Sequence, residues 1–305
     1  MNYTLVGLIA VLIWGVSLPA GKVVQEQIGP VAYIGILFLV TGILSLARQR
    51  FLFSFKKAEL SHPVFYLRWA FFVLHEGLIS ISVGIVSLHN LPIVILINYL
   101  WPTAIILCSI FLAGVRVYRP VIFTIGTVIV LASLGYELLG GAEIGRNVFL
   151  SHMDNIAYGL TFLGAISWGL YCALSKRYGS VTGEARPIAL FQLTLGLALP
   201  FIFLPQFNHS WNLNLVGAMV LGGICLAQAL AYYAWDIGMR LGNIVVLSLL
   251  ADFIPWVSLV CTTLILGVKI EKRTALSAVC LVIGALITRF ATRTPSISTK
   301  DVQLT

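Results

Sequence analysis

The sequence predicts an all-α polytopic membrane protein with ten transmembrane helices in two inverted five-helix repeats. Three observations lead to this fold class. Of the 305 residues, 59% are hydrophobic and only 10% are charged, which is too little polar surface for a soluble protein of this size. Ten apolar runs are each long enough to cross a bilayer. The residue pattern of the first half also recurs in the second.

Each apolar run holds about 17–25 residues, enough to cross ~30 Å of hydrocarbon as an α-helix. No run alternates with period two for long, which disfavours a β-barrel. Neither Lys nor Arg precedes the first run, and its length exceeds that of a usual signal peptide core, so we expect it to be retained. The predicted spans are 3–22, 30–47, 64–87, 91–113, 121–138, 155–175, 185–205, 213–238, 243–267 and 274–292.

An internal repeat organises these spans. Trp14-Gly15 recurs as Trp168-Gly169, and Lys22 recurs as Lys176. Matches at almost the same shift link Asn90 to Asn243, Pro102 to Pro255, and Gly114-Val115-Arg116-Val117 to Gly267-Val268-Lys269-Ile270. The distance in sequence between matched residues covers five spans. Because five is odd, the second copy is expected to cross the membrane in the opposite orientation to the first. We therefore predict repeats at 1–150 and 151–293, followed by a disordered cytoplasmic tail at 294–305.

Charge predicts the orientation. An even number of spans places both termini on one side, and a cytoplasmic N-terminus puts fourteen of the 19 Lys and Arg residues inside, as the positive-inside rule favours. Lys269 falls outside because its repeat partner, Arg116, falls inside. The net charge of +8 thus reflects membrane topology and does not indicate nucleic acid.

An unusual cluster, Asn98-Tyr99-Leu100-Trp101-Pro102, lies in the middle of the fourth span. Trp and Tyr usually lie at the membrane surfaces. Tyr99 and Trp101, like Trp14 and Trp168, lie at mid-span instead, where aromatic rings offer walls for an apolar solute or a cation. Packing in the protein core is the alternative interpretation. Pro102 and Pro255 predict kinks that frame a cavity and flex, or merely bend packed helices.

Acidic side chains also lie at mid-span. A charge in the middle of a membrane costs about 2.5–3.5 kcal/mol, so such a residue usually faces a cavity or a partner. We therefore predict that His75-Glu76 binds an ammonium group or relays a proton. The alternative is a neutral Glu76 that hydrogen-bonds between helices. Asp252 occupies the repeat position of Tyr99 and is predicted to bind an amine or proton, with a structural hydrogen bond as the alternative. Gln228 and Tyr232 share one face of the eighth span.

Other polar residues predict ordinary structural roles. Lys22 and Lys176 are expected to reach the headgroups, and Asp236 is expected to pair with Arg240 at the surface. The five cysteines lack metal-ligand spacing. A zinc-protease motif fails because Ile79 stands where the second His would be. No metal, cofactor or catalytic group is predicted.

The Trp-Gly pairs, the closing Gly-Val-(Arg/Lys) and the inverted halves resemble the EamA-type drug/metabolite transporter superfamily. Asn98–Pro102, His75-Glu76, Tyr232–Gly238 and Gly242-Asn243 more specifically resemble its bacterial aromatic amino acid exporter branch, whose members also handle paraquat-like cations. The resemblance implies a cavity between spans one, three, four, six, eight and nine. The chain departs from the pattern of this branch at three positions. His75 stands where the branch usually has a Tyr, Asp252 where it has an uncharged residue, and Asp236 where it has an Asn.

The resemblance implies an exporter of amino acids, aromatic or hydrophobic ones first, that works by alternating access in a bacterial plasma (inner) membrane. A multidrug or organic-cation exporter is the alternative, and a membrane-embedded enzyme is less favoured. The expected partners are a small-molecule substrate and membrane lipid, and the protein is expected to be monomeric. The predicted substrate-binding residues are Trp14, His75, Glu76, Asn98, Tyr99, Trp101, Trp168, Gln228, Tyr232 and Asp252, with Pro102 and Pro255 as kinks.

Overall fold

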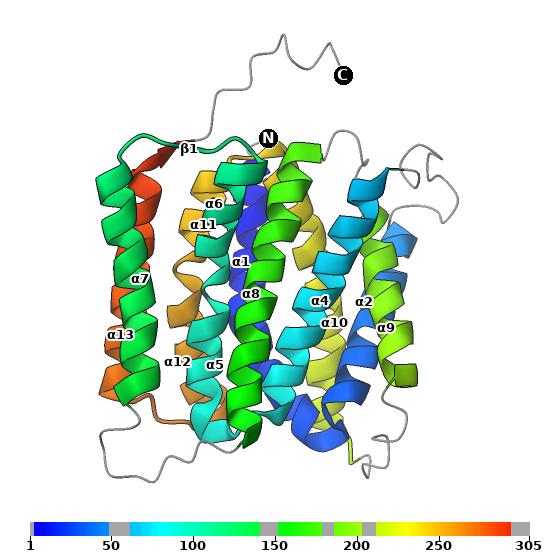
Figure 1. Ribbon diagram of the computed structural model, residues 1–305. Coiled ribbons are helices and arrows are strands. Elements are labelled where there is room, and N and C mark those ends of the chain that lie inside the picture. Colours follow the sequence, from blue (N-terminus) through cyan, green and yellow to red (C-terminus); the bar gives the residue numbers. More distant parts are fainter. Residues whose placement is uncertain (1–2, 49–61, 141–151, 179–185, 203–211, 294–305) are drawn as a thin grey trace.

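The computed structural model describes residues 3–48, 62–140, 152–178, 186–202 and 212–293. Its helices run side by side in a single bundle (Figure 1). Among the described residues, nine helical segments are long and apolar enough to cross a membrane. The seventh predicted span, 185–205, corresponds to α9 (Arg186–Ile202), whose apolar part, Ile188–Ala198, is shorter. The predicted all-α polytopic membrane fold is thus confirmed, while the two inverted repeats stay a prediction and the tail at 294–305 lies outside the described residues.

The described part of the chain forms thirteen helical elements and two short strands. In chain order they are α1 (Tyr3–Ile28), α2 (Pro30–Arg48), α4 (Pro63–Ile85), η1 (Leu88–Asn90), α5 (Leu91–Asn98), α6 (Trp101–Leu112), β1 (Arg116–Val117), α7 (Pro120–Gly140), α8 (His152–Tyr178), α9 (Arg186–Ile202), α10 (Leu215–Leu241), α11 (Ile244–Ala251), α12 (Ile254–Leu266), α13 (Lys272–Phe290) and β2 (Thr292–Arg293).

The two sequence halves are interleaved. The most extensive helix pairs are α1 with α10, α4 with α8, α2 with α9, and α7 with α13, and each joins one helix from either half. In Figure 1 the α7–α13 pair forms one edge of the bundle and the α2–α9 pair lies at the other. Antiparallel pairing of Arg116 with Arg293 and of Val117 with Thr292 ties β1 to β2 at the end where α1 begins.

Both proline-containing central spans are interrupted rather than simply kinked. The fourth span divides between Asn98 and Trp101, and the ninth divides between Ala251 and Ile254. Each proline lies in the first turn of the second segment. A proline has no backbone N–H, so it cannot bond the carbonyl four residues earlier, and it fits best at a helix start. The break in the fourth span also carries aromatic and amide side chains, Asn98, Tyr99 and Trp101, that line a cavity.

Lys22 and Lys176 cap the ends of other helices instead of extending to the headgroups as expected. The Lys22 ammonium lies 3.1 Å from the carbonyl oxygen of Val83 and 3.0 Å from that of Val86, where α4 ends. The Lys176 ammonium lies 2.7 Å from the Gly242 carbonyl, where α10 ends. The last carbonyls of a helix lack helical partners and carry partial negative charge, so they attract an ammonium.

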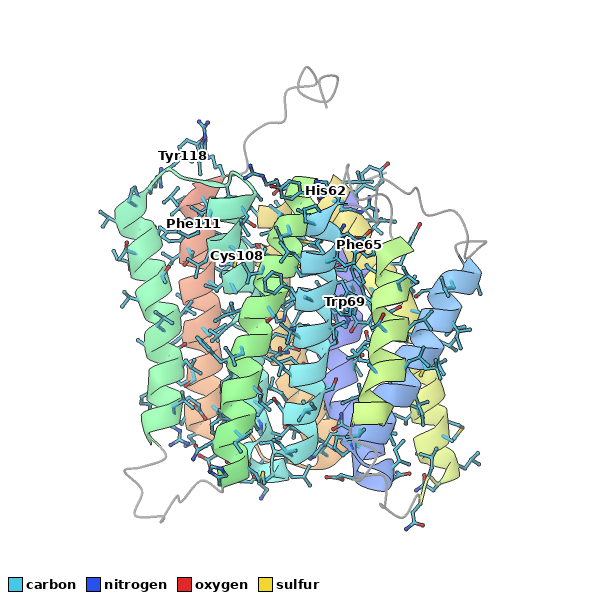
Figure 2. The ribbon with its side chains drawn as sticks, turned by 45° about the vertical axis from the view of Figure 1, so that its right-hand side comes forward. His62, Phe65, Trp69, Cys108, Phe111 and Tyr118 are labelled. Atoms are coloured by element: carbon cyan, nitrogen blue, oxygen red, sulfur yellow. The ribbon has the colours of Figure 1, made fainter. Side chains whose placement is uncertain are left out.

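The outer surface of the bundle is apolar. The side chain of Phe111 is 80% exposed, and Figure 2 shows it near one end of the bundle together with Tyr118. Large exposed apolar side chains also extend along α7 and α10, for example Val121 and Leu226. This surface suits contact with hydrocarbon, and the polar side chains of the site are buried among the helices.

Gly126→Ala is expected to loosen the α7–α13 pair. A Cβ atom at position 126 would lie 2.6 Å from the backbone nitrogen of Thr288 and 2.7 Å from the carbonyl oxygen of Gly284. Such overpacking against backbone costs about 1–3 kcal/mol. The measurement is thermal unfolding of the detergent-purified protein.

Gly135→Ala on the same helix is the matched control, because a Cβ there meets no atom within 4 Å. It should leave stability unchanged or raise it by up to about 1 kcal/mol through helix propensity. Equal melting temperatures for the two variants would contradict the close packing of α7 on α13.

Candidate functional site

A cavity lies at the centre of the bundle, and the empty space within it and at its mouth amounts to about 680 Å³. Its walls come from α1, α2, α4, α5, α6, α8 and α10. On α1 the lining runs from Trp14 to Gln25, and on α4 it runs from His75 to Val83. The cavity therefore extends from mid-bundle toward the end where α1 and α4 terminate.

The cavity gathers nine of the ten residues predicted to bind substrate, from six helices. They are Trp14, His75, Glu76, Asn98, Tyr99, Trp101, Trp168, Gln228 and Tyr232. Residues that were not predicted from the sequence complete the walls, among them Ser17, Gln25, Tyr33 and Ser80. Ser17 follows Trp14 by three positions on α1, and Ser80 follows Glu76 by four on α4. This helical spacing is the signal that could have identified both serines.

Asp252 is the exception, because the structure does not bring it together with the other nine residues. It is fully buried but does not line the cavity. Its Oδ1 lies 3.1 Å from Nη2 of Arg289 on α13, in an ion pair between two buried side chains. A buried carboxylate needs such a partner. Arg289 was expected among the cytoplasmic charges, so this pair was not predicted.

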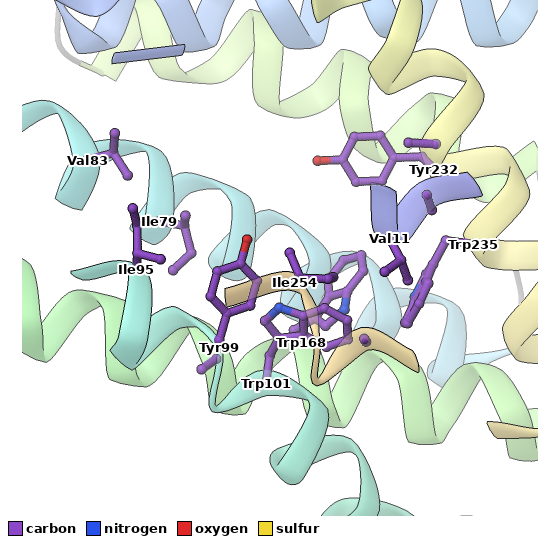
Figure 3. Close-up of a cluster of buried hydrophobic side chains, with 14 of the residues drawn as sticks. Val11, Ile79, Val83, Ile95, Tyr99, Trp101, Trp168, Tyr232, Trp235 and Ile254 are labelled. Carbon is purple, nitrogen blue, oxygen red and sulfur yellow. The ribbon is translucent and has the colours of Figure 1, made fainter. Parts of the chain in front are cut away.

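Trp14 is the centre of an aromatic cluster that we define as Trp14, Trp101, Trp168, Tyr232 and Trp235. The ring centroid of Trp14 lies 5.1–6.2 Å from those of the other four. Its Nε1 donates a hydrogen bond of 2.8 Å to Oε1 of Gln228, which fixes the indole. Figure 3 shows Trp101, Trp168, Tyr232 and Trp235 in this region, the last two contributed by α10. This cluster closes the cavity toward the end where α1 begins.

Three aromatic rings of this region were not predicted as site residues. Trp235 belongs to the cluster, while Tyr171 and Phe72 support it from outside the cavity. Tyr171 stacks on Trp168 at 5.0 Å, and Phe72 lies 5.4 Å from Tyr232. Trp235 and Tyr171 follow predicted residues by three positions, so the same helical spacing could have indicated them.

Beyond the aromatic cluster lies a charged group made by Arg68, Asp236, Arg240 and Ser175. Nη2 of Arg68 lies 3.7 Å from Oδ1 of Asp236, and Nε of Arg240 lies 2.7 Å from Oδ2. Arg68 also donates a hydrogen bond to Ser175. The predicted Asp236–Arg240 ion pair is present, but Asp236 is only 2% exposed, so the expected surface location is wrong. The pair lies inside because Arg68 approaches from α4.

The Tyr99 hydroxyl is occupied within the protein. Its oxygen lies 2.6 Å from Oγ of Ser258, and Ser258 donates its single hydroxyl proton to the carbonyl of Gly15 at 2.7 Å. Tyr99 must then be the donor to Ser258. The phenol joins α5 to α12 and α1, so a solute in the cavity meets the ring rather than this proton.

The polar wall of the cavity contains several hydrogen-bond acceptors. Glu76 and Tyr232 both line this wall, and Oε1 of Glu76 lies 3.8 Å from Nε2 of His75. The side-chain oxygens of Gln25 and Asn98 are buried without a hydrogen-bond partner. No Lys or Arg occurs among the described lining residues. This wall suits a solute that carries an ammonium group.

The described residues contain no group of three His, Cys, Asp or Glu side chains that could hold a metal ion. The five cysteines are free, and all are buried or half-buried. The chemistry of the cavity therefore rests on its aromatic rings, amides, imidazole and carboxylate.

The chain is similar in sequence to known transporters. Residues 155–290 match the EamA-like transporter family. The chain is 26% identical to the aromatic amino acid exporter YddG of Salmonella typhimurium and 25% identical to that of Escherichia coli, over 95% of this chain and 97% of each relative. A solved crystal structure with 21% identity has the same fold, with a TM-score of 0.70 over 94% of this chain and 96% of that one. The resemblance predicted from the sequence is confirmed.

Arg289→Met is expected to destabilise the protein strongly, because it leaves the Asp252 carboxylate buried without its cation. Removing one partner of a buried pair costs about 3–5 kcal/mol. The double variant Asp252→Asn/Arg289→Met removes both charges and should recover much of that loss. Thermal unfolding in detergent measures both effects. If the double variant were as unstable as the single one, the ion pair would not explain Asp252.

Proposed function

We propose that this protein exports amino acids with aromatic or hydrophobic side chains across a bacterial inner membrane, with both of its termini in the cytoplasm. The transporter class rests on the EamA-like domain and on the exporter relatives. The substrate class rests on one observation, a cavity whose aromatic wall adjoins a single carboxylate, Glu76. An enzyme would need a catalytic or metal-binding group, and the geometry of this cavity supports neither.

In this proposal each part of an aromatic amino acid meets a different wall. The ammonium group lies against Glu76, where a charge-assisted hydrogen bond compensates for lost water. The side chain lies against Trp14, Trp101 and Trp168 through ring contacts. The amide N–H groups of Asn98 and Gln25 are available to the carboxylate. Tyr99 contributes its ring face, because its hydroxyl is bound to Ser258.

An organic-cation exporter is a second candidate, favoured by the absence of Lys and Arg among the described lining residues. Such a cation needs the carboxylate and the aromatic faces but no donor for a carboxylate. Resistance of cells to paraquat-like cations, measured beside their tolerance of phenylalanine, separates the two candidates. Protection against the cation alone would favour this second function.

The proposed mechanism is alternating access between two inverted repeats, 1–150 and 151–293. The helix contacts support this symmetry, since α1 with α10 corresponds to α8 with α4, and α1 with α12 corresponds to α8 with α6. The repeated lysines support it as well, because each caps the third span of its own half. Gly114 and Gly267, a repeated pair, share a left-handed backbone with φ of 73° and 68°.

The observed arrangement corresponds to one state of that cycle. The aromatic cluster and the Arg68–Asp236–Arg240 group close the end where α1 begins, which is the cytoplasmic end in the proposed orientation. The cavity extends toward the opposite end. Transport requires these closing contacts to separate while the other end closes, so the two ends exchange roles around a fixed midplane site.

Glu76→Gln and Trp101→Ala are each expected to reduce efflux of labelled phenylalanine from loaded vesicles by roughly tenfold or more. Glu76→Gln removes a charged hydrogen-bond partner worth about 1.5–3 kcal/mol. Trp101→Ala removes a wall of the cavity. Glu26→Gln is the control, because Glu26 is exposed and does not line the cavity. Efflux at the wild-type rate in both cavity variants would contradict the site.

Cysteine labelling tests the proposed state and orientation. In a variant without the native cysteines, Ser80→Cys should react with a membrane-impermeant thiol reagent added from the periplasmic side, because Ser80 lines the cavity and is half-buried. Ser175→Cys should react several times more slowly, because Ser175 is 1% exposed behind the aromatic cluster. Phenylalanine should protect the thiol introduced at position 80. Faster labelling at position 175 would reverse the assigned state.

A further inference from the structure

We infer that His75 makes the cavity selective for primary ammonium groups over quaternary ones. The inference rests on the proposed function, in which the cationic group of the substrate lies beside Glu76. It goes further by assigning a specificity-determining role to the neighbouring imidazole. Its consequence is that an aromatic solute with N–H bonds binds better than the same solute with a fully methylated nitrogen.

The position of the imidazole proton follows from one hydrogen bond. Nδ1 of His75 lies 2.8 Å from the backbone carbonyl oxygen of Gly164. A carbonyl oxygen only accepts hydrogen bonds, so Nδ1 must carry the proton. In the neutral imidazole the other nitrogen, Nε2, is then a lone-pair acceptor. Because His75 lines the cavity, this acceptor belongs to the polar wall.

The distance between His75 and Glu76 indicates that no proton is shared between them. Nε2 lies 3.8 Å from Oε1 of Glu76. An imidazolium beside a carboxylate, or a protonated carboxyl beside an imidazole, would form a hydrogen bond of about 2.5–2.9 Å. The two atoms are therefore neighbouring acceptors. A donor with two N–H bonds can satisfy both, one bond to the carboxylate and one to Nε2.

The imidazole cannot readily turn away from this position. Its ring lies 4.6 Å from that of Trp168 with an interplanar angle of 33°. Gly164 allows α8 to approach closely enough to bind Nδ1, since a Cβ there would lie 3.0 Å from Cδ1 of Ile79. The ring is thus fixed by stacking on one side and by a backbone bond on the other. A fixed acceptor discriminates better than a mobile one, because it cannot adapt to the wrong ligand.

A quaternary ammonium group satisfies only part of this arrangement. It keeps its charge and its contact with the aromatic faces. It has no N–H, so its methyl groups would separate Nε2 of His75 from any donor and leave that acceptor desolvated. One unmade hydrogen bond of this kind changes affinity by about tenfold.

The test compares phenylalanine with N,N,N-trimethylphenylalanine, which has the same ring and carboxylate. Affinities for the purified full-length protein are measured by isothermal titration calorimetry in wild type and in His75→Phe. Phenylalanine at position 75 keeps an aromatic ring against Trp168 and removes both nitrogens. Wild type should favour phenylalanine by about tenfold, and His75→Phe should bring the ratio close to one, mainly by weakening phenylalanine. An unchanged ratio in His75→Phe overturns the inference.

A second pair of variants keeps the inference falsifiable if His75→Phe does not fold. Gly164→Ala pushes on Ile79 and displaces the carbonyl that holds Nδ1, so the ratio should fall without any change at position 75. Gly159→Ala on the same helix is the control, because a Cβ there meets no atom within 4 Å. Equal ratios in Gly164→Ala and Gly159→Ala would overturn the role of the Gly164 bond and with it the fixed acceptor.

Failure of the proposed function gives a different result. If wild type binds neither ligand, or if Glu76→Gln leaves both affinities unchanged, then the cavity does not bind the amine at Glu76 and the proposed function fails. If Glu76→Gln weakens both ligands while His75→Phe leaves their ratio unchanged, only the role of His75 fails.

Discussion

Polar groups inside this bundle need partners in the protein or in a bound solute, because hydrocarbon offers none. This constraint separates structural charges from those that remain for a solute. Asp252 is held by Arg289, and Asp236 is held by Arg68 and Arg240. Lys22 and Lys176 bond to the carbonyl ends of helices. Glu76 instead faces the cavity beside His75.

The same constraint explains where the helices break. A proline inside a span frees a carbonyl that lipid cannot satisfy, so such a break is tolerated only among other helices or beside a cavity. In the fourth span the break brings Asn98, Tyr99 and Trp101 to the cavity wall. The equivalent break in the ninth span brings Asp252 to Arg289. One repeat position thus lines the cavity, while its counterpart anchors α13.

The spans and most of the cavity could be predicted because hydropathy and mid-span polarity are local properties of the chain. Trp14, Glu76 and Tyr232 were identified by their depth and their helical spacing. The Asp252–Arg289 pair could not be predicted, since it depends on how α13 packs against a broken helix far away in sequence. Nor could sequence show that α4 brings Arg68 against Asp236. Depth in a membrane can be read from sequence, but the direction in which a side chain points depends on packing.

The aromatic cluster also gives this protein an intrinsic spectroscopic probe. Four of its seven tryptophans meet in one place, and indoles at such short separations exchange excitation energy and interact strongly in the near-ultraviolet. Trp14, Trp101 and Trp168 also form the cavity wall. A solute that enters the cavity changes the surroundings of these fluorophores directly. In the proposed alternating-access cycle, opening of the closed end separates these tryptophans from Trp235. Occupancy and conformation would then leave distinct spectral signatures without any added label.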